Sequence, residues 1–155
     1  MTFKGWEWLE TKPGEAGRTA FVAMNFAQEF IDLKEAIKSA ISKAGYEPIV
    51  VNEDLYAGGV MDRVLACIRE ARFVVADYTG NRGGVYYEAG FALGLGKTVM
   101  HSCRKAMFDA SNKDRLHFDV AHLNIIPWTD GDLPTYSVKL ETHILAVLGR
   151  GPVKP

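Results

Sequence analysis

The segment most informative about the fold is Phe73-Val74-Val75-Ala76-Asp77, in which four consecutive apolar residues are followed by a single carboxylate. A segment with helical composition, Val85–Leu95, follows it, and Thr98-Val99-Met100 is apolar again. Strands that are apolar on both faces are typical of a parallel sheet that helices cover on each side. Strand, helix and strand in this order therefore predict an α/β unit.

The same alternation extends in both directions along the chain. Thr19–Met24 and Pro48–Val51 have the length and composition of strands, and apolar residues recur three and four apart after each of them. Later, Leu123–Trp128 is predicted to be a last strand and Tyr136–Leu148 a closing helix, whereas residues 102–115 are polar and predict a long loop. We therefore expect an open, doubly wound parallel sheet of about five strands with flanking helices, as in flavodoxin or Rossmann-like folds.

The chain of 155 residues has the length of one ordinary domain. Residues 1–18 show no sustained period and predict an N-terminal arm, in which Trp6 and Trp8 suit an edge strand or a contact with a second subunit. Residues 19–149 are predicted to form a single α/β domain, and residues 150–155 a C-terminal tail.

Composition narrows the classes of function. Hydrophobic residues make up 48% of the chain and charged ones 24%, which is typical of a globular protein in water. The net charge of -1 removes the main electrostatic argument for a nucleic-acid polymer or an anionic membrane as partner. No apolar run approaches the ~20 residues that cross a bilayer, and no signal peptide is recognised, so we expect a cytoplasmic protein. Cys67 and Cys103 lack metal-binding spacing and are expected to be free, buried thiols.

Ligands of open parallel sheets bind beyond the carboxyl ends of the strands, near the point where the strand order reverses. Met24 and Asn25 lie at the end of the first predicted strand, Asp54 follows the second, Asp77 ends the third and His101 ends the fourth. Asn25 and Asp54 are therefore candidate hydrogen-bonding groups for a ligand, although Asp54 is equally the kind of residue that forms turns. A lone histidine such as His101 is more often structural than a ligand contact.

The connection after Asp77 carries the largest set of candidate residues. It contains three glycines, two tyrosines and a glutamate: Gly80, Gly83, Gly84, Tyr86, Tyr87 and Glu88. The glycines permit tight turns and the close approach of a ligand to the backbone. The tyrosines and Glu88 are expected in the first turn of the next helix, where the helix dipole favours an ionised carboxylate. Glutamate also stabilises first turns, so Glu88 alone has a purely structural interpretation as well.

These residues carry a resemblance to known proteins. Residues 76–81, followed by Val85-Tyr86-Tyr87-Glu88-Ala89-Gly90 and continuing to Lys97, resemble the signature of the nucleoside 2-deoxyribosyltransferase superfamily. The stretch is also similar to bacterial TIR-like domains of the NAD-cleaving type. The order of elements from Phe21 to Val99 matches both, and the resemblance covers about half of the chain.

The resemblance implies roles for individual residues. Glu88 would be the nucleophile, and Asp77 would help to hold the sugar or the base. Tyr86 and Tyr87 would shape the sugar pocket or restrain the glutamate. Residues 116–119 are similar to a segment of TIR-like proteins, which makes Asp119 a candidate for the same site. Relatives often complete the pocket with a neighbouring subunit, so a homo-oligomer is expected.

The implied chemistry is cleavage of the bond between a base and a sugar. It passes through an oxocarbenium-like transition state, which a carboxylate stabilises or traps as a covalent glycosyl-enzyme. Glu88 is then the nucleophile, while Asp77 is expected to bind the substrate rather than to protonate it. We expect no metal and no cofactor. Cleavage of NAD by a TIR-like enzyme, and a non-catalytic module that senses a nucleotide, are the alternatives.

Other residues near the motif have two interpretations each. Asn81 either bonds a sugar hydroxyl or the edge of a base, or forms a turn. Arg82 either pairs with a 5′-phosphate or is a solvated cation of the loop, and Gly84 would let a ligand approach the backbone. Trp128 and Phe118 are expected to be core residues rather than platforms on which a base stacks.

Overall fold

The computed structural model describes residues 17–51 and 59–154. Within these ranges the chain forms parallel strands that alternate with helices. The strands are β1 (Thr19–Ala23), β2 (Glu47–Ile49), β3 (Phe73–Asp77), β4 (Thr98–Arg104) and β5 (Ile125–Trp128). The helices are α1 (Ile31–Lys43), α2 (Val60–Glu70), α3 (Gly83–Gly94), α4 (Lys105–Asp109), α5 (Phe118–Ala121) and α6 (Leu133–Leu148), and a short 3-10 turn, Gln28–Phe30, precedes α1.

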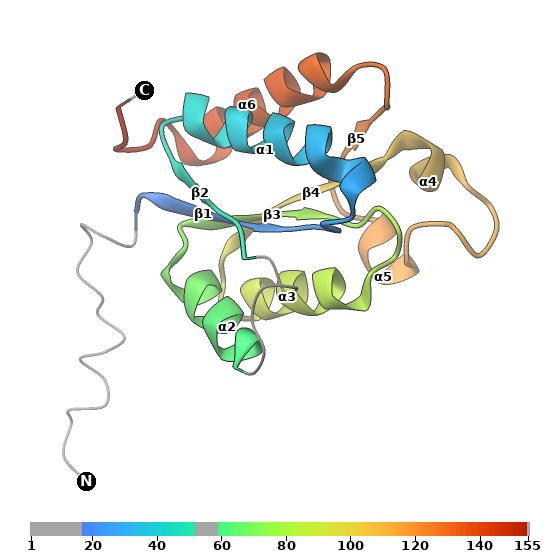
Figure 1. The fold of residues 1–155 in the computed structure, drawn as a ribbon, viewed down its shortest axis with the longest axis horizontal. Coiled ribbons are helices and arrows are strands. Elements are labelled where there is room, and N and C mark those ends of the chain that lie inside the picture. The colour runs from blue at the N-terminus through green and yellow to red at the C-terminus, as the bar shows by residue number, and fades with distance from the viewer. Residues whose placement is uncertain (1–16, 52–58, 155) are drawn as a thin grey trace, which may run out of the picture.

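All five strands are parallel and lie in the order β2-β1-β3-β4-β5. Helices α1 and α6 cover one face of this sheet, and α2 and α3 cover the other (Figure 1). The predicted doubly wound α/β fold with about five strands is therefore confirmed. None of the helices in the described ranges combines the length and the apolar character that crossing a bilayer requires.

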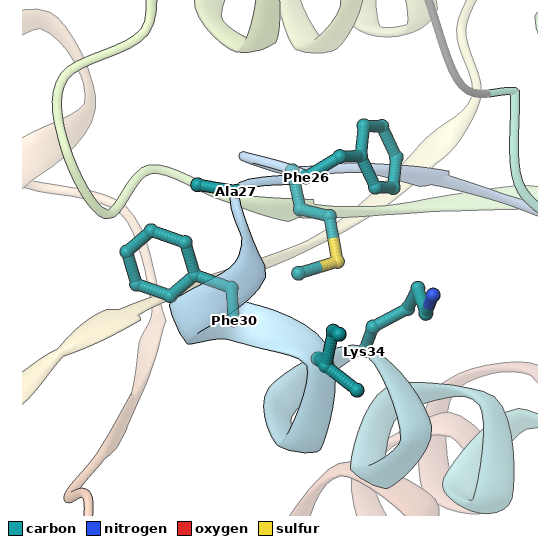
Figure 2. A pocket seen from close by; sticks show the side chains of 6 residues that line it. Phe26, Ala27, Phe30 and Lys34 are labelled. Atoms are coloured by element: carbon teal, nitrogen blue, oxygen red, sulfur yellow. The ribbon is translucent and has the colours of Figure 1, made fainter. Parts of the chain in front are cut away.

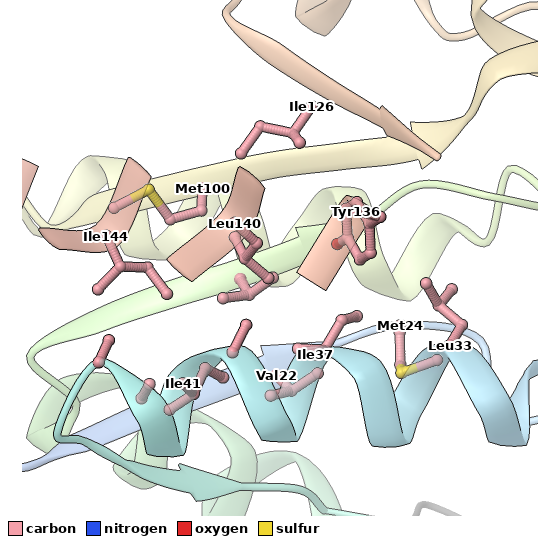
Figure 3. Packing of buried hydrophobic residues seen from close by; sticks show 14 of the residues in the cluster. Val22, Met24, Leu33, Ile37, Ile41, Met100, Ile126, Tyr136, Leu140 and Ile144 are labelled. Atoms are coloured by element: carbon pink, nitrogen blue, oxygen red, sulfur yellow. The ribbon is translucent and has the colours of Figure 1, made fainter. Parts of the chain in front are cut away.

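Each face of the sheet has its own hydrophobic core. Figure 3 shows the core beneath α1 and α6, where Leu33, Ile37 and Ile41 of α1 meet Leu140 and Ile144 of α6. Within each helix these side chains recur four residues apart, so each helix presents one apolar stripe to the sheet. The second core lies beneath α2 and α3. The strands are thus buried on both faces, which explains their continuous apolar sequence.

The prediction of a long polar loop over residues 102–115 is wrong for the first half of that range. Strand β4 continues to Arg104, and α4 follows it directly. The physical reason is pairing with the next strand, since Ser102 lies opposite Ile126 and Cys103 opposite Pro127. Cys103 is buried and Cys67 is half-buried, and both thiols are free.

Candidate functional site

The strand order reverses between β1 and β3, so a ligand site is expected beyond the carboxyl ends of these two strands. The loops that follow them are in contact there. A Cβ placed on Gly80, whose φ is +85°, would lie only 3.2 Å from Nδ2 of Asn25. Oδ1 of Asn25 accepts a hydrogen bond from the Ala27 amide at 3.0 Å, so this side chain also shapes its own turn.

Asp77 ends β3 with its side chain inside the protein, at 1% exposure. Its Oδ1 accepts a hydrogen bond from the Thr79 amide at 3.0 Å, and its Oδ2 accepts bonds from Ser102 Oγ and Trp128 Nε1, both at 2.8 Å. The Ser102 hydroxyl also lies 2.9 Å from that of Tyr136. A carboxylate buried among neutral donors is stabilised by such bonds. Asp77 therefore links β3, β4, β5 and α6.

The side chains of Asp77 and Glu88 belong to opposite faces of the sheet. Phe73 and Val75 of β3 lie in the core beneath α1 and α6. Asp77 comes two residues after Val75, so its side chain points to the same face of the sheet. Its partners Trp128 and Tyr136 lie in that core as well. Glu88 is carried by α3, which covers the other face (Figure 1). The structure therefore does not set the two carboxylates face to face, and a catalytic role for Asp77 stays a prediction.

Glu88 is buried, with 6% of its surface exposed. It shares the sheet-facing stripe of α3 with Val85, Ala89 and Ala92, which are all apolar. The prediction that Glu88 lies in the first turn is wrong, because α3 already begins at Gly83 and the first turn contains no acidic residue. Gly83 and Gly84, which the sequence placed in the loop before Val85, are part of the helix. Because the dipole effect fades beyond the first turn, it contributes less to Glu88 than the sequence indicated.

Tyr86 and Asn81 connect the start of α3 to the segment before α5. The Tyr86 hydroxyl donates to Oδ1 of Asn81 at 2.7 Å and accepts from the His117 amide at 3.2 Å. Nδ2 of Asn81 donates to the carbonyl oxygen of Arg115 at 3.3 Å. Asn81 has a positive φ of 51°, a conformation that asparagine tolerates better than most residues. Both side chains thus hold loops together, whereas Tyr87 is 52% exposed.

A row of aromatic rings runs inward from this connection. Tyr86 stacks on Tyr78 with 4.8 Å between ring centroids, and Tyr78 stacks on His101 at 5.8 Å. The Tyr78 hydroxyl and Nδ1 of His101 are joined by a hydrogen bond of 2.7 Å. Burial raises the pKa of Tyr78 and of Tyr86, and it lowers the pKa of His101 to about 4. At neutral pH these rings are therefore uncharged.

The remaining predicted residues are spread over the carboxyl edge of the sheet. Met24 is 5% exposed and lines a small, shallow hollow with Phe26, Phe30 and Lys34 (Figure 2), on the side of α1. Arg82, Gly84 and Asp119 are exposed. Arg82 and Gly84 flank the start of α3, and Oδ2 of Asp119 lies 3.2 Å from Nδ1 of His117. Asp54 lies outside the described residues.

No local sequence pattern identifies the hydrogen-bond partners of Asp77. The sequence predicts a loop at Ser102 and a helix at Tyr136. Pairing of β3 with β4 brings Ser102 to the carboxylate, and Tyr136 of α6 reaches the Ser102 hydroxyl. Trp128 is a core residue as predicted, at 3% exposure. The same prediction for Phe118 is wrong, because it begins the short helix α5 and is 77% exposed. A helix of four residues is too short to bury every apolar side chain that it carries.

Among residues 17–51 and 59–154, no group of three or more His, Cys, Asp and Glu side chains is arranged to hold a metal ion. Comparison with models of protein families and with curated proteins gave no match for this chain.

Proposed function

We propose that this protein cleaves or transfers the N-glycosidic bond of a nucleoside or nucleotide, with Glu88 as the nucleophile. The observation that supports this best is the burial of Glu88, at 6% exposure, in an otherwise apolar stripe of α3. Burying a carboxylate is costly, and such groups cluster at functional sites. Glu88 also lies in the second turn of a helix that starts at the carboxyl edge of the sheet, where ligands of this fold bind.

In the proposed reaction the Glu88 carboxylate faces the anomeric carbon of the sugar. It stabilises the positive charge that develops as the bond to the base breaks, and it then forms an ester with the sugar. Water or a second base releases the sugar from this intermediate. A low-dielectric environment such as the one around Glu88 strengthens its interaction with the developing cation.

Substrate contacts are proposed for the exposed groups at the same edge. Arg82 is suited to a 5′-phosphate, and the exposed backbone of Gly83 and Gly84 at the start of α3 lets an anion approach the amide groups. Asn25 is placed to contact a sugar hydroxyl or the edge of a base from the end of β1. Asp77 acts in this proposal as a positioning residue, because its hydrogen bonds hold the ends of the central strands.

The experiment is incubation of the protein with nucleosides, nucleoside monophosphates and NAD, with chromatography of the free base. Glu88→Gln removes the nucleophile and keeps the size of the side chain, and we expect base release to fall by at least about a hundredfold. Glu35→Gln, at an exposed glutamate of α1, is the matched control and should retain activity. Thermal unfolding of both variants establishes that they are folded.

The outcomes separate the alternatives. Base release that survives Glu88→Gln contradicts the role of Glu88. Release from NAD alone identifies the NAD-cleaving variant of the same chemistry. Nucleotide binding without any release favours the sensing module. Trapping by a 2-fluoro nucleoside, read as a mass increase that Glu88→Gln abolishes, separates a covalent intermediate from electrostatic stabilisation alone.

A further inference from the structure

Arg104 is a half-buried cation at the carboxyl edge of the sheet, and the proposed reaction does not use it. It ends β4, and the central carbon of its guanidinium group lies over the rings of Phe30 and Trp128, at 5.5 Å and 4.9 Å from their centroids. Both rings belong to the core beneath α1 and α6, whereas α3 with Glu88 covers the other face of the sheet (Figure 1). Ligands of open parallel sheets bind at this edge.

The hydrogen bonds of Asp77 hold the surroundings of Arg104 in place. Asp77 accepts hydrogen bonds from Trp128 Nε1 at 2.8 Å and from the Thr79 amide at 3.0 Å. The Thr79 hydroxyl oxygen in turn accepts a hydrogen bond from the Arg104 amide at 2.9 Å. The same buried carboxylate thus fixes the backbone of Arg104 and one of the rings beside its guanidinium group. A side chain held in this way loses little rotamer freedom when it binds a ligand.

The donors of the guanidinium group are only partly used. Nη2 of Arg104 donates to Oδ1 of Asp130 at 2.9 Å. Nε is buried and donates no hydrogen bond to any residue that the structure describes. Nε and Nη2 form one edge of the planar group, and such an edge can donate two parallel hydrogen bonds to one carboxylate or phosphate group. Because a buried donor without an acceptor is unfavourable, an anion that uses both donors is favoured at this edge.

We propose that Arg104 binds the phosphate group of a small ligand, which displaces Asp130 from the guanidinium edge. The side chain of Asp130 is 71% exposed, and exposed ion pairs contribute little to stability, so its displacement is easy. A phosphate monoester carries about 1.5 to 2 negative charges at neutral pH, and it is therefore attracted more strongly than the single charge of Asp130. This inference does not depend on the function proposed for Glu88, which lies on the other side of the sheet.

An NMR titration tests the site in the full-length protein, with inorganic phosphate and a nucleoside monophosphate as separate probes. The reporter is the indole N–H signal of Trp128, whose ring lies beside Arg104, and it is identified as the signal that Trp128→Phe removes. We expect this signal to shift saturably in the unmodified protein. Arg104→Gln should weaken the binding of both probes at least about tenfold, because the charged donors are lost. Asp130→Asn should strengthen it about threefold, because the competing carboxylate is gone.

Lys105 and Asp109 provide matched controls, because Lys105 follows Arg104 directly and forms an exposed ion pair with Asp109. Lys105→Gln and Asp109→Asn change the net charge as the two test substitutions do, and both should leave the affinities unchanged. Circular dichroism establishes that each variant is folded. If Arg104→Gln does not fold, Asp130→Asn still decides, because tighter binding supports the site and unchanged or weaker binding overturns it.

Three further outcomes overturn the proposal. They are the absence of any saturable shift with either probe, equal weakening by Lys105→Gln, and binding that Arg82→Gln abolishes but Arg104→Gln retains. Where Arg104→Gln weakens both probes, their affinities identify the source of the phosphate group. Equal affinities identify free phosphate as the ligand, and tighter binding of the monophosphate identifies a nucleotide.

Discussion

Asp77 and His101 are buried ionisable side chains on the central strands, and the free-energy cost of their burial is reduced in two different ways. Asp77 accepts hydrogen bonds from the Thr79 amide and from two side chains of neighbouring strands. His101, on β4 and 6% exposed, stays neutral, because burial lowers its pKa to about 4. Hydrogen bonds can compensate a buried anion, whereas the buried His101 imidazole, whose hydrogen-bond partner Tyr78 is neutral, stays uncharged.

Protonation of His101 should make the stability of the fold depend on pH. In the unfolded chain the histidine takes up a proton below its ordinary pKa of 6.5, but in the folded chain it does so only near 4. The stability that a neutral His101 permits is therefore present above pH 6.5 and lost as the pH falls from 6.5 to 4. Between pH 7 and pH 5 we expect urea unfolding to show a loss of about 2 kcal/mol from this group.

His101→Gln isolates that contribution, because glutamine does not titrate. Its free energy of unfolding should fall by about 2 kcal/mol less than that of the unmodified protein over the same pH range. Equal losses in the two proteins would mean that His101 is already charged or exposed in the folded state. The substitution also removes the hydrogen bond to Tyr78. That loss lowers the stability of the variant at both pH values, so it does not affect the comparison of the losses between pH 7 and pH 5.

At the scale of elements, the connection between β3 and α3 is fastened to the segment before α5. Asn81 and Tyr86 hold that segment through the Arg115 carbonyl oxygen and the His117 amide. The ring of Tyr86 also lies edge-on to His117, which in turn contacts the exposed ring of Phe118. These contacts are exposed to water, so we expect them to open more readily than the core.

Tyr86→Phe keeps the ring and removes both hydrogen bonds of the hydroxyl. With each bond contributing about 1 kcal/mol, opening of the segment should become roughly thirtyfold more frequent. The measurement is the rate at which trypsin cleaves after the exposed Lys113 and Arg115. Tyr87→Phe, on the exposed side of the same helix, should cleave at the rate of the unmodified protein. Identical rates for all three proteins would show that the hydroxyl of Tyr86 does not hold the segment.

At the scale of the whole molecule, the C-terminal residues close the fold against the end of α1. The Gly151 amide donates to the Ala44 carbonyl oxygen and the Val153 amide to that of Gly45, both at 2.9 Å. The Tyr46 hydroxyl donates to the Gly149 carbonyl oxygen at 3.0 Å. The predicted tail after residue 149 is thus docked on the domain as far as the structure describes it, and two glycines let the backbones touch.

Gly151→Ala should destabilise the whole domain. A Cβ at this position would lie 2.1 Å from the Gly45 carbonyl oxygen, so either the backbone shifts or the C-terminal residues detach. We expect the free energy of unfolding in urea to fall by about 1–3 kcal/mol, the usual cost of overpacking. Gly131→Ala is the control, since a Cβ there meets nothing within 4 Å. Equal stability of the two variants would contradict a docked C-terminus.

Much of the fold could be predicted from local patterns. Apolar runs such as Phe73–Ala76 and the four-residue spacing of Leu33, Ile37 and Ile41 are properties of neighbouring residues, and the structure contains the corresponding strand and helix. The start of α3 was placed two residues too late, because glycines are weak helix formers and only their context makes Gly83 and Gly84 helical.

For the candidate site, local patterns are enough to predict a strand that ends in Asp77 and a glycine-rich connection that leads to Glu88. The directions of the two side chains follow from how the strands and helices pack. Because β3 is apolar on both faces, its sequence does not reveal which face each residue occupies, and that depends on how the crossovers place α3 and α6. The pairing of β3, β4 and β5 then gave Asp77 its partners, and the shortness of α5 left Phe118 exposed. These outcomes depend on contacts between residues far apart in the chain, which local sequence patterns do not specify.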